Sequence, residues 1–314
     1  MTLPSLADIQ AAHSRIKPFI HNTPVLSSRQ LNMMFNCELL FKCENLQRVG
    51  AFKFRGATNA VLLLSDEEKR RGVVTHSSGN HAAALALAAF MNGVDANIVM
   101  PETAPVVKKN AVAGYGAKIT FCKPTLQARE ETTLMIMERT GATLIHPYDN
   151  FNVICGQGTA SLELLTQKPD LDFVIAPVGG GGLMSGTSTC VKGMNKKIKV
   201  IGAEPLNAND AWKSFTSGKL VPSVNPLTVA DGLLTSLSNL TFSIIGKNVD
   251  QILTVTEESI IESMLLVWER MKIIIEPSSA TVLAVIMENP EIFKGKKAGL
   301  IISGGNVDFR KLPF

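Results

Sequence analysis

The chain of 314 residues has few cysteines, a low share of charged residues and no long run of one charge sign. Charged residues make up 18% of it, below the quarter usual for globular domains. The net charge is only +4, and the densest basic run is Lys196, Lys197 and Lys199, so we expect a solvated turn there and no nucleic-acid partner. The five cysteines show no CxxC spacing, which favours reduced thiols over a disulfide framework or a zinc site.

Signals for secretion and membrane insertion are also missing. Asp8 comes early, and the first residues lack the apolar core of a signal peptide. Residues 173–191 are uncharged over nearly a membrane-spanning length, but Pro177 and four consecutive glycines divide them into a predicted strand, loop and helix. We therefore predict a soluble cytoplasmic protein. Its length and its hydrophobic content of 46% allow one large or two medium domains.

Strand-like and helix-like segments alternate, which predicts an α/β fold with parallel-rich twisted sheets flanked by helices. We expect a small domain over residues 69–148, inserted into a large domain made of 1–68 and 149–314. The stretch 217–250 is expected to be the least regular part. The predicted strands are 38–42, 72–76, 96–100, 117–122, 142–146, 172–177, 198–204 and 298–303. The predicted helices are one within 1–30, then 80–92, 105–114, 126–140, 153–167, 182–193, 257–272 and 278–288.

One lysine stands in a segment of unusual composition. Lys53 lies between Phe52 and Phe54, and Gly50 and Gly56 bracket the run. Flanking phenylalanines can shield an ammonium group from water, and desolvation lowers the pKa of a lysine toward neutrality. A lysine tuned in this way can bond covalently to a carbonyl compound through its amine. The alternative interpretation is a surface lysine on an amphipathic turn.

A polar loop joins the predicted strand 72–76 to the predicted helix 80–92. Backbone N–H groups at a helix N-terminus can bind a carboxylate or a phosphate, and small hydroxyl side chains let the ligand approach closely. The alternative is that a serine or the asparagine only caps the helix. The loop residues are Ser77, Ser78, Gly79, Asn80 and His81.

A glycine run follows the predicted strand 172–177 and precedes the predicted helix 182–193. Consecutive glycines have an entropic cost, but their N–H groups can converge on a phosphate with no Cβ in the way. The run is neither a P-loop nor a dinucleotide-binding turn, because the required spacings are absent. A site for a monophosphate is the better interpretation. The residues are Gly179, Gly180, Gly181 and Gly182, followed by Leu183.

The last apolar strand ends in a fourth motif, Ser303-Gly304-Gly305-Asn306. Ligands of open α/β sheets sit beyond the carboxyl ends of the strands. We therefore expect Ser303 to face the same cleft as the glycine run.

The four motifs, in this order, resemble those of the fold-type II family of pyridoxal-phosphate enzymes, and within it the serine racemases and serine/threonine dehydratases. The resemblance covers essentially the whole chain. It implies a two-domain fold like that of the tryptophan synthase β subunit, a homodimer, a small amino-acid substrate and pyridoxal 5'-phosphate as cofactor.

The resemblance also implies roles for the motif residues. Lys53 would hold the cofactor aldehyde beside Phe52, Asn80 would bind its phenolic oxygen, and Ser303 its ring nitrogen. The four glycines and Leu183 would bind its phosphate. The loop 77–81 would hold the substrate carboxylate, with help from Arg129. The freed amine of Lys53 would take the α-proton as general base. Loss of the β-hydroxyl then gives a keto acid and ammonia, whereas a proton returned from the opposite face gives racemisation.

Two features favour the racemase branch. Ser78 stands where dehydratases of the family often carry alanine, and a racemase needs a second acid/base group on the opposite face. Glu204, Asp210 and the carbonyl of Ala208 resemble the divalent-cation site of the racemases, and oxygen donors suit Mg²⁺ or Ca²⁺. The alternative for Asp210 is a helix cap.

Other features depart from the animal serine racemases. Arg48, Val49 and Ala83 are not the residues of their nucleotide-effector site, so ATP activation is not expected. The segment 146–149, His-Pro-Tyr-Asp, is more similar to that of the dehydratases. No regulatory domain follows residue 314, which speaks against an allosteric threonine deaminase. We predict interconversion of L- and D-serine together with elimination of water from serine or threonine. The alternative is a dedicated dehydratase of L-serine, L-threonine or 3-hydroxyaspartate.

Three other classes fit less well. A cysteine-synthase-like enzyme usually has Thr-Ser-Gly-Asn-Thr-Gly where this chain has His-Ser-Ser-Gly-Asn-His. A non-catalytic binding protein on this scaffold would be expected to lose Lys53. An NAD-dependent oxidoreductase would carry a glycine fingerprint that is missing here.

Overall fold

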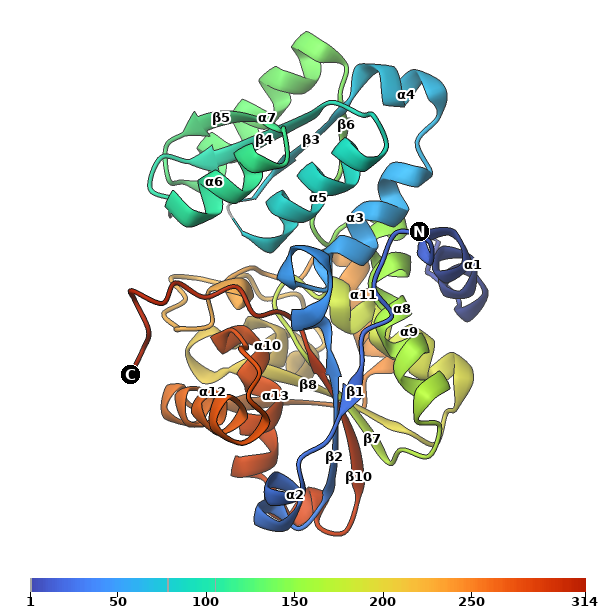
Figure 1. Cartoon of the computed structure of the whole chain (residues 1–314), viewed down its shortest axis with the longest axis vertical. Coiled ribbons are helices and arrows are strands. Elements are labelled where there is room, and N and C mark those ends of the chain that lie inside the picture. The colour runs from blue at the N-terminus through green and yellow to red at the C-terminus, as the bar shows by residue number, and fades with distance from the viewer. Residues whose placement is uncertain (1, 78, 105) are drawn as a thin grey trace.

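The computed structural model describes residues 2–77, 79–104 and 106–314. Two sheets form an upper and a lower part of the molecule in Figure 1. Every strand pair among the described residues is parallel except β1 with β2. The lower sheet has the order β1 (Val25–Leu26), β2 (Glu38–Cys43), β10 (Lys297–Ile302), β7 (Phe173–Pro177), β8 (Lys199–Pro205) and β9 (Gln251–Val255). The upper sheet has the order β5 (Lys118–Cys122), β4 (Ala96–Pro101), β3 (Val73–His76) and β6 (Thr143–Leu144).

Helices cover both faces of the lower sheet. Ile175 of β7 packs on one face with α12 (Glu257–Met271) and α13 (Pro277–Glu288). Its neighbours Val174 and Ala176 pack on the other face with α8 (Phe151–Gln167) and α9 (Gly182–Met194). Because side chains alternate along a strand, β7 is apolar on both faces, as a buried parallel strand requires.

The upper sheet is covered in the same way. Val73 and Ile98 pack against α5 (Asn80–Met91), which lies beside α6 (Val106–Gly114). Val74 and Val99 pack on the opposite face against α7 (Leu126–Thr140).

Helix α3 (Lys53–Leu62) connects the two parts, because it packs against both α8 below and α5 above (Figure 1). Its start therefore lies where the two sheets approach each other. The remaining elements are α1 (Leu6–Ile16), α2 (Arg29–Phe35), η1 (Glu44–Leu46), η2 (Arg48–Gly50), α4 (Asp66–Arg71), η3 (Leu206–Ala208), α10 (Asp210–Ser217), η4 (Asp231–Leu233), α11 (Asn239–Asn248) and α14 (Pro290–Phe293).

The α/β class and the alternating order of the middle block are confirmed, since β3, α5, β4, α6, β5, α7 and β6 follow one another. The predicted strand 142–146 is too long, because β6 covers only Thr143–Leu144. Ile145 N–H still donates to the carbonyl of Val74, but its own carbonyl accepts a hydrogen bond from His81. The stretch 217–250 is more regular than expected. It contains α11, which begins with a capping box between Ser238 and Thr241. The domain limits, 69–148 within 1–68 and 149–314, stay a prediction.

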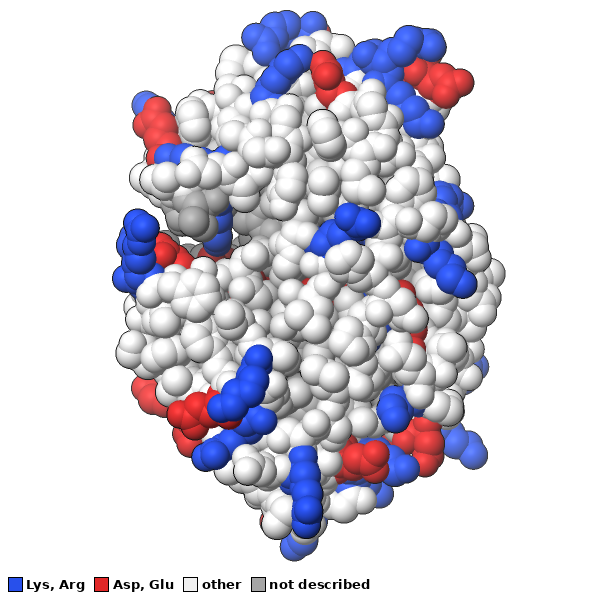
Figure 2. Space-filling model, viewed as in Figure 1, with Lys and Arg blue, Asp and Glu red and all other residues white. Residues whose placement is uncertain are grey.

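The surface on the face shown in Figure 2 carries dispersed basic side chains interspersed with acidic ones, without a continuous basic patch. Within the described ranges, no helix combines the length and the apolar character needed to cross a bilayer. The five cysteines are buried and free.

Candidate active site

Lys53 begins α3 and is the centre of the site. Its Nζ donates a hydrogen bond to the carbonyl of Pro147 at 2.9 Å and lies 5.2 Å from the ring centroid of Phe52. Burial lowers the pKa of Lys53 to about 8, although the carboxylate of Glu276 acts in the opposite direction. An amine with that pKa is in part neutral near physiological pH and can act as a nucleophile or a base.

The two phenylalanines beside Lys53 have different surroundings. Phe52 supplies the aromatic neighbour of the ammonium group, whereas Phe54 is fully buried in the core that α3 shares with α5. The expectation that both rings shield Lys53 was therefore wrong. Phe52 and Phe54 are two positions apart at the start of a helix, so their side chains point in different directions.

The end of β10 lies beside the lysine segment. Phe52 N–H donates to the carbonyl of Ser303 at 2.9 Å, and Ala51 forms an antiparallel bridge with Gly304. Ser303 is buried, and its hydroxyl lies 2.9 Å from that of Ser279 on α13. The structure thus brings the first and fourth sequence motifs together.

Glu276 is a site residue that the sequence analysis missed. It is the N-cap of α13, and burial raises the pKa of its carboxyl group to about 7. Asn80 donates to both of its oxygens at 3.0 and 3.1 Å, and Asn306 donates through Nδ2 to Asn80 Oδ1 at 2.9 Å. This chain of amides joins the second motif to the fourth. An acidic residue directly before a proline and a long apolar helix was the available signal.

The structure describes residues 77 and 79–81 of the loop 77–81. Ser77 is half-buried, and its hydroxyl accepts a hydrogen bond from Gly79 N–H at 3.3 Å. His81 is buried, and its Nε2 donates to the carbonyl of Ile145 at 3.0 Å. Burial lowers the pKa of His81 to about 3, so its ring is neutral. Ser78, predicted as the second acid/base group, lies outside the described residues.

Basic side chains gather on the upper side of the site. The rings of His76 and His146 pack edge to face with centroids 5.6 Å apart, and the ring of Tyr148 packs in the same way on His146 at 4.6 Å. Burial lowers the pKa of His76, and the charge of Arg129 lowers it further. Arg129 lies on α7, close enough to His76 for its charge to act on that ring, and its role in holding the substrate stays a prediction.

The glycine run lies under Tyr148 at the end of β7. A Cβ at Gly180 would overlap the Tyr148 ring, and one at Gly182 would lie 2.8 Å from Tyr148 Cβ. Gly181 has φ +84°, a left-handed conformation that favours glycine. A Cβ at Gly179 would lie 3.0 Å from Leu233 Cα. The run is therefore a cradle that only glycines can form. It opens α9, whose first N–H groups have no partner within the helix, as a phosphate site requires.

Two buried carboxylates lie at the end of β8. Glu204 accepts hydrogen bonds from the backbone N–H groups of Ala211 at 2.8 Å and Trp212 at 2.7 Å, at the start of α10. Burial, with the neighbouring Asp210, raises the pKa of Glu204 to about 8, and burial raises that of Asp210 to about 6. Asp210 Oδ2 is buried and has no hydrogen-bond partner among the residues that the structure describes. Ala208 is buried in η3 between the two carboxylates in sequence.

A cavity of about 550 Å³ adjoins the site on the side of Asn80 and Asn306. Val49 and Ala83, two positions singled out from the sequence, line it together with Lys108 and Asp231. Lys108 of α6 and Asp231 of η4 form an ion pair of 2.6 Å across the hollow between the two parts.

The fold and these motifs define a pyridoxal-phosphate site, and the chain belongs to the family of pyridoxal-phosphate dependent enzymes, whose model matches residues 16–304. It is 53% identical to the serine racemase of Dictyostelium discoideum over an alignment of 318 positions, which covers 99% of this chain and 98% of that protein. It is 48% identical to the beta-hydroxyaspartate dehydratase of Paracoccus denitrificans over 314 residues, the full length of both. The structure of maize serine racemase matches with a TM-score of 0.97 at 42% identity, covering 98% of this chain and 95% of that one. The predicted family is confirmed.

Proposed function

We propose that the protein is a serine racemase that also eliminates water from serine and related β-hydroxy amino acids. The observation that carries the proposal is the lowered pKa of the Lys53 amine. The backbone of Phe52 next to it is hydrogen-bonded to Ser303, and the hydrogen-bond partner of the amine, Pro147, precedes Tyr148, which packs on the glycine cradle. The similarity to a serine racemase along the whole chain supports it.

The residues present suit pyridoxal 5'-phosphate. The cradle at 179–182 would hold the phosphate with backbone N–H groups at the start of α9. Its positions require glycine, because a Cβ there would lie too close to neighbouring atoms. Leu183 is buried next to the cradle, and Ser303 would meet the ring nitrogen. Lys53 would bind the aldehyde carbon, and Asn80 the phenolic oxygen. When bound, the cofactor withdraws electrons and stabilises negative charge on the substrate α-carbon.

The chain's own groups would then carry the protons. A neutral Lys53 amine removes the α-proton on its side of the substrate. The loop 77–81 holds the substrate carboxylate at the N-terminus of α5, where backbone N–H groups and the helix dipole favour an anion. Arg129 and His76 lie on the upper side, where a second polar group of the substrate would bind.

Ser78 is proposed as the acid/base group of the opposite face. Racemisation needs an acid/base group on both faces of the α-carbon, because a proton is removed from one face and returned to the other. Elimination from an L-amino acid needs only the group on the lysine face. Because a positioned acid/base group contributes roughly 10²–10⁴-fold, Ser78→Ala should lower racemisation by about that factor. Keto-acid formation from L-serine should persist, and that from D-serine should fall.

The test is to incubate the purified enzyme with L-serine, L-threonine and threo-3-hydroxyaspartate, and to measure both keto acid and enantiomer ratio. D-Serine formation that Ser78→Ala leaves intact would contradict the two-group assignment. If wild type forms keto acid but no D-serine, the second candidate holds, a dedicated dehydratase. The similarity to a beta-hydroxyaspartate dehydratase and the basic groups His76 and Arg129 favour 3-hydroxyaspartate as its substrate.

We also propose that Glu204, Asp210 and the Ala208 carbonyl bind Mg²⁺ or Ca²⁺. Asp210 Oδ2 has no hydrogen-bond partner among the described residues, and burial raises the pKa of both carboxyl groups. Both observations support a cation here, since a cation would stabilise the ionised forms that burial disfavours. A cation bound only to the folded state at 100 times its Kd stabilises it by about 2.7 kcal/mol. Chelation should therefore lower the melting temperature of wild type and leave Asp210→Asn unchanged. If chelation lowers the melting temperatures of wild type and Asp210→Asn equally, Asp210 does not bind the cation and acts only as a helix cap. Assembly as a homodimer and a cytoplasmic location stay predictions.

A further inference from the structure

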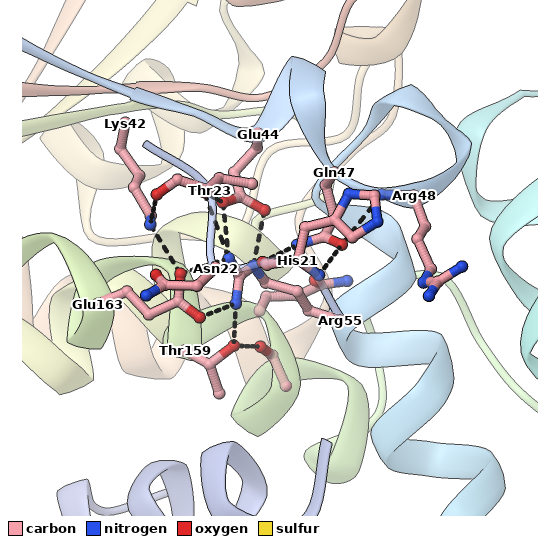
Figure 3. Close-up of polar contacts among 12 residues, drawn as sticks. His21, Asn22, Thr23, Lys42, Glu44, Gln47, Arg48, Arg55, Thr159 and Glu163 are labelled. Atoms are coloured by element: carbon pink, nitrogen blue, oxygen red, sulfur yellow. Dashed lines mark hydrogen bonds and ion pairs between the residues drawn. The ribbon is translucent and has the colours of Figure 1, made fainter. Parts of the chain in front are cut away.

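Four charged side chains are buried together below the start of α3. Arg55, Lys42 and Glu44 are inaccessible to solvent, and Glu163 is only 6% exposed. They come from α3, β2, η1 and α8, respectively, and are drawn in Figure 3. Two positive and two negative charges balance, so the cluster has no need of a ligand.

Arg55 is the centre of this cluster. Its Nε and Nη2 donate to the two oxygens of Glu44 at 2.6 and 2.8 Å. Its Nη1 and Nη2 donate to the two oxygens of Glu163, both at 2.8 Å. A guanidinium can hold two carboxylates in this forked way, whereas a lysine ammonium is a point donor. The side chain of Arg55 is thus fixed relative to η1 and α8 at once.

Lys42 belongs to the same cluster but has a different place in the fold. Its Nζ donates to Glu163 Oε2 at 2.7 Å and to the carbonyl of Thr23 at 2.7 Å. It lies on β2, and the carboxylate that it shares with Arg55 through hydrogen bonds is that of Glu163. Lys42 therefore resembles Arg55 in charge and burial, and differs from it in not being on the helix of Lys53.

The connection to Lys53 runs through α3 and α8. Arg55 is two residues after Lys53, and the N-cap residue Phe52 makes no side-chain capping bond that would fix where α3 begins. Gly56 is packed so closely on α8 that a Cβ would lie 2.5 Å from Gln157 Nε2 and 2.7 Å from the Val153 carbonyl. The carbonyl that accepts from Lys53, that of Pro147, lies just before α8. Helix α8 therefore carries Glu163, which binds Arg55, and begins shortly after Pro147, which binds Lys53.

We propose that Arg55 is a positioning residue for Lys53, whose fork to Glu44 and Glu163 fixes the first turn of α3 and with it the direction of the amine. The inference rests on the proposed role of Lys53 as the residue that binds the cofactor. A displacement of a reacting group by about 1 Å can cost roughly 10²-fold in rate. If Arg55 positions Lys53, replacing Arg55 should therefore weaken cofactor binding at Lys53 more than its effect on protein stability would explain.

The test compares Arg55→Met with Lys42→Met, because each removes one cation from the same cluster and leaves an unbranched apolar side chain. The apoprotein of each variant is titrated with pyridoxal phosphate, reduced with borohydride and mapped for pyridoxyl-lysine, and its unfolding midpoint is measured. We expect both variants to be less stable than wild type. We expect Arg55→Met to bind the cofactor at Lys53 roughly tenfold or more weakly than Lys42→Met, which should stay within about twofold of wild type.

Arg55→Lys provides the second comparison if Arg55→Met does not fold. It keeps the charge and should recover stability, but it cannot fork to two carboxylates, so cofactor affinity should stay low. Equal cofactor affinities in the Arg55 and Lys42 variants would overturn the positioning role and leave Arg55 as a structural ion. A wild-type protein whose borohydride label maps to a lysine other than Lys53 would instead overturn the proposed function.

Discussion

Lys53 and Arg55 are two residues apart on α3, but the surroundings of the two side chains shift their pKa values in opposite directions. Arg55 is buried between Glu44 and Glu163, and the hydrogen bonds and charges of these carboxylates outweigh burial and raise the pKa of the guanidinium. Within the described ranges, Lys53 Nζ has the carbonyl of Pro147 as its hydrogen-bond partner and the ring of Phe52 as its aromatic neighbour, and burial lowers its pKa to about 8. One charge is fully compensated and the other is not.

The difference separates structural charges from reactive ones. A buried ion with a complete set of partners has no free energy to gain from a ligand, whereas a desolvated group without a counter-ion gains when a ligand removes its charge or pairs with it. By this criterion we expect Lys53, Glu276 and the pair Glu204 and Asp210 to be functional groups. The cluster around Arg55 belongs to the structure, and acts on the chemistry only through position.

The largest expected effect follows from Lys53→Ala. Turnover should fall by at least about 10⁴-fold, because the anchor of the cofactor and the general base are lost together. The stability of the apoprotein should not fall, since the removed amine is desolvated and unpaired by any carboxylate. Keto-acid formation and chemical denaturation of the apoprotein measure the two quantities. Residual turnover within tenfold of wild type would show that another lysine carries the chemistry.

The opposite pattern is expected for Glu163→Gln. Breaking a buried ion cluster by neutralising one member typically costs about 3–5 kcal/mol in free energy of unfolding, because Arg55 and Lys42 would share the single carboxylate of Glu44. Urea denaturation of the apoprotein provides the measurement. The control is Asp170→Asn, which breaks the exposed pair of Asp170 with Lys297 and should leave stability unchanged. Similar values for the two variants would mean that the cluster contributes no more than a surface pair.

The sequence was sufficient for the features that depend on local pattern. Strand–helix alternation predicted most elements, and the glycine run, the loop 77–81 and the Ser303 segment were each predicted to be parts of one site. What the sequence did not reveal depends on packing between distant segments. Glu276 reaches the site only because α13 begins beside Asn80 and Asn306. The buried charge of Arg55 depends on Glu44 and Glu163, and no local spacing relates Glu163, which lies 108 positions away, to it.

The orientation of neighbours was equally hidden from the sequence. Phe52 and Phe54 look equivalent beside Lys53, but the helical start at residue 53 sends them into different cores. Gly56 brackets the run around Lys53 in the sequence. It lies inside α3 because the approach of α8 leaves no room for a side chain. Helix propensity is overruled there by packing.

A smaller effect is expected in the pH dependence of the apoprotein. Burial raises the pKa of Glu276 to about 7 from 4.5, so the folded state binds its proton more tightly than the unfolded state between these values. Stability from this group is complete below pH 4.5 and is lost as the pH rises through 7. Wild type should therefore lose on the order of 2 kcal/mol relative to Glu276→Gln between these limits.

Lys53 should contribute with the opposite slope at higher pH. Its pKa is lowered from 10.5 to about 8, so the unfolded state binds the extra proton and stability rises with pH between these values. Lys53→Met should remove this rise in stability, but the loss of stability that Glu276 causes as the pH rises to 7 should remain. Chemical denaturation of the three apoproteins at several pH values measures both. A difference between wild type and Glu276→Gln that does not change with pH would show that the Glu276 carboxyl group does not titrate in this range.

The smallest effect separates the two phenylalanines beside Lys53. The Lys53 Nζ lies 5.2 Å from the centroid of the Phe52 ring, where a cation–π interaction contributes roughly 0.5–1 kcal/mol to the charged form. Phe52→Leu should therefore lower the pKa of Lys53 further, by about half a unit, since one unit corresponds to about 1.4 kcal/mol. Phe54 is buried in the core shared by α3 and α5, so Phe54→Leu should cost about 1–2 kcal/mol of stability and leave the amine unchanged. The pH dependence of Lys53 acylation in the apoprotein, followed by peptide mass, reports the pKa directly. Matching acylation profiles for the two variants would mean that the Phe52 ring acts only by excluding water, and that desolvation alone sets the reactivity of Lys53.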